Sequence, residues 1–225
     1  MSLFKRIIAL TPDRFQEELK RIYFRRQIRN GKFVTDELEF SEIHNFVNEG
    51  DWAIDVGANI GHYTIKLSEL LGAKGRVIAF EPIPVTFAHL AENTLHSKYK
   101  NITLINAAVS EKTEMVGMSI PDFDTGLKNY YEASISNKIS DTDTSVLTLS
   151  IDSLQIDHKI SLLKIDAEGH EPAVFSGAMK LIEKNLPVII VETVTDQIRK
   201  NLQKLGYKEE VLKGSHNTIF KIWES

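Results

Sequence analysis

The sequence predicts a doubly wound α/β fold, in which helices cover both faces of a mostly parallel sheet. Three observations predict it. Short apolar runs that fit strands alternate with amphipathic stretches that fit helices along most of the chain. The run Val77-Ile78-Ala79-Phe80 is continuously apolar, as expected when both faces of a parallel sheet are buried. A glycine turn, Gly57 to Gly61, joins the first apolar run to the next amphipathic stretch.

The elements are expected in a fixed order along the chain. A helix at about 37–47 leads through Asn48-Glu49-Gly50 into the first strand. Strands are then expected at 52–57, 76–81, 102–109, 160–166 and 187–192, helices at about 60–71, 84–97, 171–184 and 196–205, and closing strands near 207–212 and 217–223.

The alternation breaks between about residues 114 and 150. Two β-prone pieces there flank a polar loop that contains Phe123, Tyr130 and Tyr131. Loops of this length inside compact domains are often functional or disordered. We expect an insertion on the substrate side, with a plain surface loop as the alternative.

The length of 225 residues fits one α/β domain, expected over residues 36–225, with an N-terminal extension over residues 1–35. The chain has no cysteine, which excludes disulfides and thiolate metal sites and favours a reduced, cytoplasmic setting. No run approaches the roughly 20 apolar residues of a membrane span, and charge interrupts the opening segment too early for a secretory signal.

The extension is basic, although the whole chain carries a formal net charge of −4. Residues 1–35 hold nine Lys or Arg against three acids, so the rest of the chain is acidic, which argues against a broad nucleic-acid surface. We expect a basic helix that packs on the domain, forms a homodimer or contacts an anionic membrane surface. Its apolar residues are Phe4, Ile7, Ile8, Phe15, Leu19, Ile22 and Tyr23.

The glycine turn predicts a cofactor site, because glycine lets a ligand approach the backbone and the helix start aims N–H groups at it. The spacing Gly57-x-x-x-Gly61 lacks the middle glycine that makes room for a dinucleotide pyrophosphate. Asp55 would repel a pyrophosphate but can orient the amino and carboxylate ends of a methionine moiety, directly or through water. Glu81, after the second apolar run, can accept a hydrogen bond from each of two ribose hydroxyls. S-adenosylmethionine therefore fits better than NAD.

Candidate catalytic residues follow the strands, since ligands of open α/β sheets bind beyond the carboxyl ends of the strands. The richest strand end is Lys164-Ile-Asp-Ala-Glu-Gly-His-Glu171. Strand alternation puts Lys164 and Asp166 on one face, and Gly169 permits a bend that returns Glu168 to the pocket. We expect one of these two carboxylates to hold a hydroxyl or take its proton, with Lys164 fixing a carboxylate or screening oxyanion charge.

The remaining polar residues near this strand end are weaker candidates. His170 is a candidate base, with a solvated histidine as the alternative, and Glu168 and Glu171 could instead cap the following helix. Glu192 is expected to line the pocket or pair with the lysine. No metal is assigned, because Asp166 and Glu192 could hold Mg²⁺ but the sequence offers no further evident ligand. Asn217 would approach the site only if the closing hairpin folded over it.

The chain resembles the FkbM family of S-adenosylmethionine-dependent methyltransferases from about residue 36 to residue 207. The motifs that carry the resemblance are Asp55-Val-Gly-Ala-Asn-Ile-Gly-His-Tyr63, Ala79-Phe-Glu-Pro82, Asn106-Ala-Ala-Val-Ser110, Leu149-Ser-Ile-Asp-Ser-Leu154, Leu163-Lys-Ile-Asp-Ala-Glu-Gly-His-Glu171 and Ile190-Val-Glu192. The resemblance implies a Rossmann-like class I methyltransferase fold, with a mostly parallel seven-stranded sheet and an antiparallel last strand. It also implies O-methylation, often of sugar or polyketide-type hydroxyls.

The residues and the resemblance together give an expected site. The cofactor-binding residues are expected to be Asp55, Gly57, Ala58, Asn59, Gly61, Tyr63, Glu81, Asn106, Ala107, Ala108 and Asp166. The expected activity is O-methylation of a hydroxyl on a sugar, glycan or secondary-metabolite acceptor. The alternative is a non-catalytic S-adenosylmethionine-binding or scaffold protein. A nicotinamide oxidoreductase is disfavoured because no convincing Tyr-x-x-x-Lys group is present.

Overall fold

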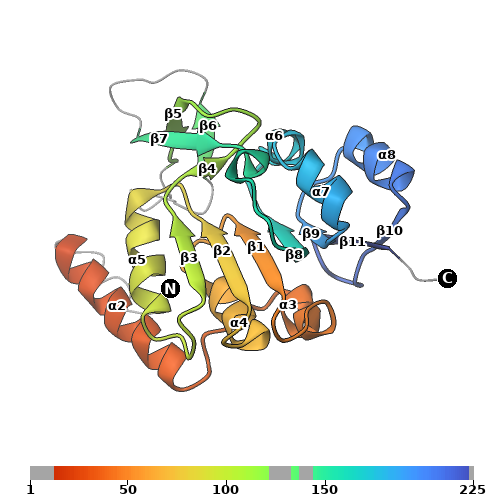
Figure 1. Ribbon diagram of the computed structural model, residues 1–225. Coiled ribbons are helices and arrows are strands. Elements are labelled where there is room, and N and C mark those ends of the chain that lie inside the picture. Colours follow the sequence, from red (N-terminus) through yellow and green to blue (C-terminus); the bar gives the residue numbers. More distant parts are fainter. Residues whose placement is uncertain (1–12, 122–132, 137–143, 223–225) are drawn as a thin grey trace.

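The computed structural model describes residues 13–121, 133–136 and 144–222. The strands of its larger sheet are β1 (Trp52–Val56), β2 (Arg76–Phe80), β3 (Ile102–Ile105), β8 (Ile160–Ile165), β9 (Val188–Val191), β10 (Tyr207–Glu210) and β11 (Thr218–Ile222). They lie in the order β10-β11-β9-β8-β1-β2-β3. A smaller sheet, which follows β3 in the chain, lies at the top of the molecule in Figure 1.

Neighbouring strands of the larger sheet are parallel, except that β11 runs antiparallel to both β9 and β10. This confirms the prediction of a mostly parallel seven-stranded sheet with an antiparallel last strand. The strand order reverses between β1 and β8, since β2 and β3 follow on one side and β9 on the other. Open α/β sheets bind ligands at such a switch point.

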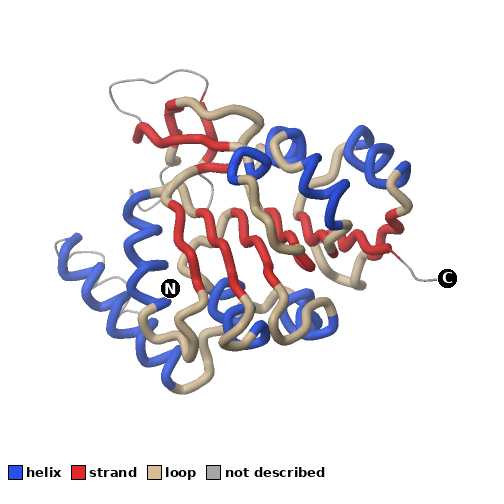
Figure 2. Tube along the Cα trace, in the orientation of Figure 1, coloured by secondary structure: helices blue, strands red, loops and turns tan. Residues whose placement is uncertain are grey.

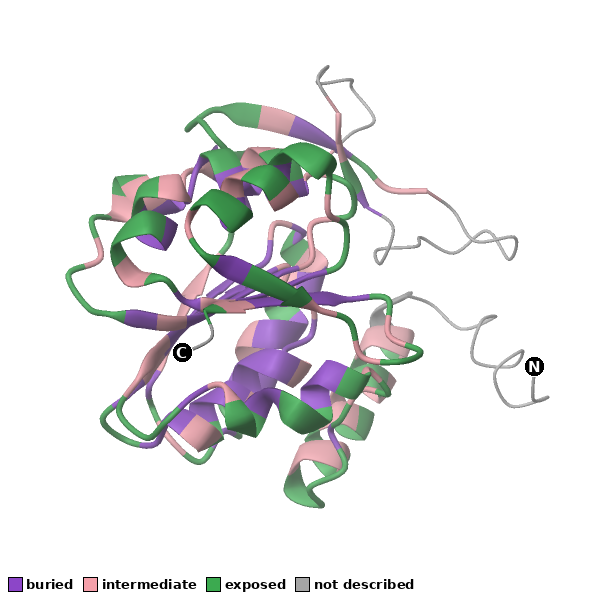
Figure 3. Cartoon of the chain, turned by 90° about the vertical axis from the view of Figure 1, so that its right-hand side faces the viewer, coloured by how far each residue is buried: buried purple, intermediate pink, exposed green. Residues whose placement is uncertain are grey.

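Helices cover both faces of this sheet, as Figure 3 shows. One face carries α3 (Leu38–Glu42), α4 (His62–Leu71) and α5 (Pro84–Thr94), and the other carries α6 (Glu171–Ser176), α7 (Met179–Asn185) and α8 (Asp196–Lys204). Alternation along β8 explains this arrangement, because Leu163 and Ile165 pack with Phe175 of α6, whereas Leu162 packs with Leu67 of α4. The doubly wound prediction is confirmed.

The strand predicted at 102–109 is wrong as a single element. The chain leaves the larger sheet after β3, and β4 (Ala108–Val109) instead pairs with β7 (Thr144–Leu149) of the smaller sheet. The side chain of Asn106 marks the change of direction, because its Nδ2 donates to the carbonyls of Glu81 and Pro82 at 2.8 and 3.0 Å. Asn106 interrupts the apolar residues of this segment, but nothing local indicates that the residues after it pair with a different sheet.

The helix predicted at 171–184 is also divided, into α6 and α7. At the break, a Cβ on Gly177 would lie 2.0 Å from the carbonyl oxygen of Ser110, so two backbones meet there. The carboxylate of Asp152 then accepts from the backbone N–H groups of Lys180 and Leu181 at 3.1 and 2.9 Å. That carboxylate caps the start of α7 and stabilises a second helix in place of one long one.

The structure describes residues 13–35 of the extension, and their helix α2 (Asp13–Arg29) packs on the outside of α5 (Figure 1). Glu92 of α5 receives Arg21 at 3.0 Å and Arg25 at 3.4 Å, and Glu17 of α2 pairs with His89. The first two pairs are exposed and contribute little stability each. The extension is therefore joined to the domain along one side of the helix.

The opposite side of α2 stays open. Phe15, Ile22 and Tyr23 are 53%, 54% and 58% exposed, so these predicted packing residues do not bury themselves on the domain. The predicted packing residues Phe4, Ile7 and Ile8 lie outside the described residues, as do Phe123, Tyr130 and Tyr131 of the inserted segment. Among the described helices, none combines the length and apolar character needed to cross a membrane.

Candidate active site

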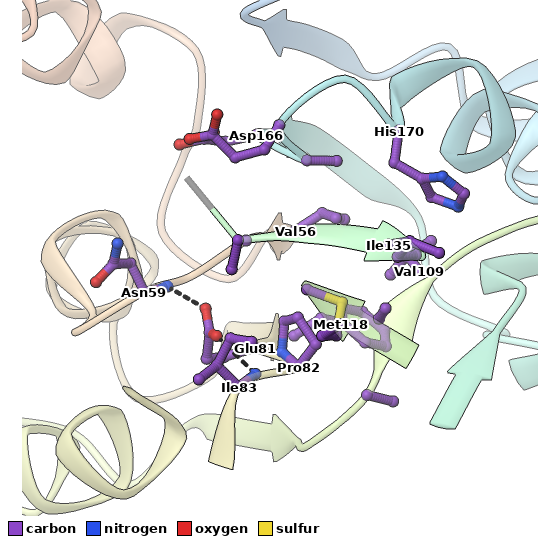
Figure 4. Close-up of a pocket in the computed structure, with 17 residues that line it drawn as sticks. Val56, Asn59, Glu81, Pro82, Ile83, Val109, Met118, Ile135, Asp166 and His170 are labelled. Atoms are coloured by element: carbon purple, nitrogen blue, oxygen red, sulfur yellow. Dashed lines mark hydrogen bonds between the residues drawn. The ribbon is translucent and has the colours of Figure 1, made fainter. Parts of the chain in front are cut away.

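A cavity lies beyond the carboxyl ends of β1, β2 and β8, at the switch point of the sheet (Figure 4). The space within it, counted together with the part open to solvent, is about 650 Å³. Of the residues predicted for the site, those on its wall are Gly57, Asn59, Glu81, Ala107, Ala108, Asp166, Glu168 and His170. Residues far apart in the sequence, from Gly57 to His170, thus line the same cavity.

The other predicted residues lie outside the set that lines this cavity. Ala58 packs with Ala79 and Leu90, and Gly61 precedes the first residue of α4. The hydroxyl of Tyr63 donates to Glu37 at 2.9 Å. Asn106, Asp55 and Lys164 each form a hydrogen bond with another residue of the protein. The ligand roles of all six stay predictions.

The glycine turn after β1 touches the turn after β8 through the backbone. Gly57 has a φ of +73°, and a Cβ on it would lie 1.8 Å from the carbonyl oxygen of Asp166. The N–H groups of Gly57 and Ala58 both donate to the carbonyl of Phe80, at 3.0 and 2.8 Å. Glycine alone adopts this positive φ without strain and also leaves room for the backbone of Asp166. This position joins the three strand ends that form the site.

The carboxylate of Glu81 is held by two backbone donors, as the dashed lines in Figure 4 show. Its Oε2 accepts from the N–H of Asn59 and its Oε1 from the N–H of Ile83, each at 2.9 Å. Each oxygen keeps a lone pair for a further donor. Burial raises the pKa of Glu81 to about 7, although the two backbone bonds oppose this shift. Hydroxyl donors from a ligand would favour the ionised form.

Asp55 is fully buried on β1. Its Oδ2 accepts from the hydroxyl of Thr64 at 2.6 Å, whereas Oδ1 has no hydrogen-bond partner within the described part of the chain. Burial raises the pKa of Asp55, and the nearby charge of Lys164 opposes the shift. A buried carboxylate oxygen without a partner is costly, so a ligand ammonium or a water that bridges to one would be stabilising here.

Lys164 and Asp166 form an ion pair at the end of β8. The Nζ of Lys164 donates to Oδ2 of Asp166 at 2.9 Å and lies 4.9 Å from the ring centroid of Tyr63. Burial by itself favours the neutral amine, but Asp166 and Asp55 outweigh it and raise the pKa of Lys164. The lysine is therefore a buried cation that fixes the orientation of the Asp166 carboxylate.

The turn that carries Glu168 has an uncommon backbone. Glu168 and Gly169 have φ values of +48° and +88°, and left-handed backbone at a residue other than glycine often occurs at functional sites. Glu171 holds this turn, because its buried Oε1 accepts from the N–H groups of Ala167 and Gly169 at 3.2 Å each. Glu171 thus binds the turn before α6, close to the capping role considered from the sequence.

His170 lies on the cavity wall and contacts a neighbouring side chain. Its Nε2 is 3.0 Å from the hydroxyl of Ser110. Burial lowers the pKa of His170, although Glu171 and Glu111 oppose this shift. A neutral imidazole can accept a proton, so His170 stays a candidate base together with the two carboxylates.

Comparison with known proteins identifies the family. A model of the methyltransferase FkbM domain matches residues 55–209. The chain belongs to the FkbM methyltransferase family. This match covers more than half of the chain and includes each strand-end residue discussed above.

This FkbM protein is also similar to a curated relative and to solved structures. The hexuronic acid methyltransferase AglP of Haloferax volcanii is 28% identical over 181 residues, which are 77% of this chain and 70% of that protein. An FkbM methyltransferase structure from Methylobacillus flagellatus KT has a TM-score of 0.52 at 18% identity, covering 76% of this chain and 43% of that one. A precorrin-6y C5,15-methyltransferase from Geobacter metallireducens GS-15 has a TM-score of 0.51 at 17% identity, covering 86% and 91%. The class I methyltransferase fold is confirmed, and the chain spans less than half of the FkbM structure.

The cofactor of this FkbM protein is S-adenosylmethionine, as predicted. Two residues near the cavity have groups that suit parts of that molecule. Glu81 has two carboxylate oxygens that can accept from ribose hydroxyls, and Asp55 has a buried oxygen that can accept from an ammonium. Gly57 makes room for the backbone of Asp166. These ligand roles stay predictions.

We expect cofactor binding to release protons near neutral pH. In the free protein the pKa of Glu81 is about 7, and ribose hydroxyls that donate to the carboxylate would lower it. Affinity should therefore rise as pH increases through about 7 and level off above it. Calorimetry with S-adenosylhomocysteine in buffers of different ionisation enthalpy measures the release. Glu81→Gln should remove it, and pH-independent wild-type affinity would contradict the assignment.

Three carboxylates near the cavity raise the question of a metal ion. Asp166, Glu168 and Glu192 each place an oxygen within 4.8 Å of the others, and burial together with Asp166 raises the pKa of Glu192. Lys164 already neutralises one member of this group. We expect methyl transfer to persist in EDTA and to be unchanged by Mg²⁺. Loss in EDTA with recovery on adding Mg²⁺ would make Asp166 a metal ligand.

The structure contains a buried polar network that the sequence did not predict. Nδ2 of Asn217 donates to Glu37 at 3.1 Å and to Glu39 at 3.2 Å, and Tyr63 donates to the same Glu37. The hairpin of β10 and β11 therefore reaches the segment that contains Glu37 and Glu39, beside the ion pair of Lys164 and Asp166. Asn217 and Glu37 are 180 positions apart, so no local pattern could indicate their contact.

Proposed function

We propose that this FkbM protein transfers the methyl group of S-adenosylmethionine to a hydroxyl of a sugar, glycan or secondary-metabolite acceptor. The observation that carries the proposal is the presence of Asp166 and Glu168 on the wall of the cavity that also contains Glu81. A hydroxyl must lose its proton as its oxygen is methylated, and a positioned carboxylate can take it. The name of the relative AglP, a hexuronic acid methyltransferase, supports a sugar acceptor.

The proposed step needs little beyond placement and a proton acceptor. Bound S-adenosylmethionine would supply a methyl group to the acceptor oxygen, and the electron pair of the broken carbon–sulfur bond would stay on its positively charged sulfur. Asp166 or Glu168 would accept the proton that the hydroxyl loses. Orientation of the reactants makes the larger contribution, about 7–11 kcal/mol of the activation free energy. A general base contributes a smaller rate factor of about 10²–10⁴.

The charges beside the cavity favour an acceptor whose reacting end is neutral. The carboxylates that interact with or lie near Lys164 are those of Glu37, Asp55, Asp166, Glu168 and Glu192. An acceptor carboxylate would be repelled by this group. On a uronic acid, the reacting hydroxyl should therefore enter first, with the acceptor's own carboxylate kept toward solvent.

An acceptor screen tests the proposal. Purified protein with methyl-labelled S-adenosylmethionine is offered neutral oligosaccharides, uronic-acid oligosaccharides, phenolic metabolites and cell glycan extracts. Mass spectrometry should find the mass of one added CH₂ on an acceptor oxygen. Label on nitrogen or carbon would overturn O-methylation. Cofactor binding without transfer to any of these acceptors would favour the non-catalytic alternative.

We also propose that the outer side of α2 contacts an anionic membrane surface. Its exposed apolar residues alternate with basic ones, which is typical of helices that lie on membranes. Replacing Phe15, Ile22 and Tyr23 with serine should reduce salt-sensitive binding to anionic vesicles and leave S-adenosylhomocysteine affinity unchanged. Val211→Ser, at a 56% exposed site that follows β10 at the far edge of the larger sheet, is the control. A change in particle size by light scattering would instead indicate a homodimer, and no change would contradict both.

A further inference from the structure

The inserted segment contributes apolar residues to the cavity. Its described strands are β5 (Met115–Ser119), β6 (Ser134–Ser136) and β7. Met118 of β5, Ile135 of β6 and Ala133 line the cavity together with Ile83 and other residues of the larger domain. Figure 4 shows Met118, Ile135 and Val109 close together on one side of Glu81. The sequence had placed this segment on the acceptor side.

The two longest of these side chains act as one surface. Met118 and Ile135 are direct partners across the antiparallel pair of β5 and β6, so their side chains project from the same face. With Ala133 they belong to an apolar cluster that includes Ile83, two residues after Glu81. Met118 and Ile83 are only 4% and 3% exposed.

The inserted strands are anchored to the cavity wall. Ala108 and Val109 of β4, which line the cavity, pair in parallel with Thr148 and Leu149 of β7. The hydroxyl of Thr148 donates to the carbonyl of Lys112 at 2.8 Å, and β7 pairs in turn with β5. Met118 is therefore held in register with the wall by two ladders of hydrogen bonds.

The cavity wall has two chemically different kinds of group. Asp166 and Glu168 supply carboxylates, whereas Ile83, Met118 and Ile135 supply an apolar surface near Glu81. A ribose held by Glu81 places its attached base within a few bond lengths of that carboxylate. A nucleobase has flat faces that are stabilised by apolar contact, and the methyl-transfer end needs the polar groups.

We infer that the inserted sheet is part of the cofactor site, with Met118, Ala133 and Ile135 covering a face of the adenine. The acceptor then enters beside the carboxylates of Asp166 and Glu168. This inference rests on the ribose lying at Glu81, and it is independent of which acceptor is methylated.

Substitutions on β5 and β6 test it with a matched control. Met118→Ala with Ile135→Ala should weaken binding of S-adenosylhomocysteine by about tenfold or more, because several buried methylene groups lose contact with the base. Met115→Ala makes the same chemical change on the same strand at a 55% exposed site, and its affinity should stay within about twofold. Met118→Leu, used in place of Met118→Ala, keeps the apolar surface and should restore most of the affinity for S-adenosylhomocysteine.

A second ligand separates the base from the amino-acid end. Methylthioadenosine keeps the adenine and ribose but lacks the amino acid, so the double variant should weaken it by the same factor. Asp55→Asn should weaken S-adenosylhomocysteine more than methylthioadenosine. A loss confined to S-adenosylhomocysteine in the β5 and β6 variant would overturn the inference.

Hydrogen exchange on the unaltered protein covers the case in which the double variant does not fold. Both ligands should slow amide exchange in Met115–Ser119 and in Ser134–Ser136, because the base packs against these strands. Unchanged exchange in both strands at saturating ligand would overturn the inference. Unchanged S-adenosylhomocysteine affinity in a folded double variant would also overturn the inference. If methyl transfer fell in that variant while the affinity was unchanged, the segment would belong to the acceptor site.

Discussion

Replacing Asp166 or Glu168 with its amide should lower turnover by about 10²-fold or more, while affinity for S-adenosylhomocysteine falls far less. An amide keeps the shape of the side chain but cannot take a proton from the acceptor hydroxyl. Both side chains lie on the cavity wall, so both can reach a ligand there. Single-turnover transfer of the labelled methyl group measures the chemical step, and calorimetry measures cofactor binding.

The two variants differ in what else they disturb. Asp166→Asn also removes the partner of the buried Lys164, which leaves a cation with weaker compensation and should lower the melting temperature. Glu168 is exposed, so Glu168→Gln should leave the melting temperature close to wild type. Glu192→Gln removes a nearby negative charge and is the control for general electrostatics. Wild-type turnover in both amide variants would remove the two carboxylates from the mechanism.

Much of the fold was predictable because its signals are local. The run at Val77 to Phe80 is apolar on both faces, and the strand β2 there lies between β1 and β3 with helices on both sides. The glycine turn at Gly57 was predicted for the same reason, since the strand before it and the helix after it are adjacent in the sequence. Short connections then leave few arrangements for a parallel sheet.

The breaks inside elements were not predictable, because distant groups cause them. Gly177 ends α6 where the backbone of Ser110 approaches, and Asp152 caps the next helix from a different segment. The segment predicted as one strand at 102–109 is interrupted at Asn106, but its new direction depends on the pairing of β4 with β7, about 40 residues later in the chain. A pattern read within one window contains no information about such partners.

The site residues divide in the same way, into those with a local sequence signal and those placed by distant contacts. Asp166 and Glu168 were predicted from one motif, and the structure brings both to the cavity with Glu81. The positions of Met118 and Ile135 on the cavity wall depend on the pairing of β5 and β6. The sequence predicted strands in this segment and a place on the substrate side, but it did not indicate which side chains line the cavity. The contact of Asn217 with Glu37 depends on the closing hairpin and could be stated only as a condition.

Glu81→Ala should produce the largest loss of cofactor affinity among the binding residues. Two ribose hydrogen bonds to a charged acceptor are worth about 1.5–3 kcal/mol each at most, so the loss should be about 10²-fold or more. The substitution also leaves the N–H groups of Asn59 and Ile83 without their carboxylate, which loosens the glycine turn and the cavity wall together.

A ligand change separates the ribose contacts from this loosening. The 2′-deoxy analogue of S-adenosylhomocysteine lacks one ribose hydroxyl, so it should bind wild-type protein more weakly but bind Glu81→Ala with nearly the affinity of the parent ligand. Glu81→Gln keeps the size of the side chain and an acceptor oxygen, and it should fall between wild type and alanine. Calorimetry on the three proteins with both ligands gives the coupling energy directly. If the deoxy analogue loses as much affinity in Glu81→Ala as in wild type, the ribose does not lie at Glu81, and the adenine position inferred from it must move as well.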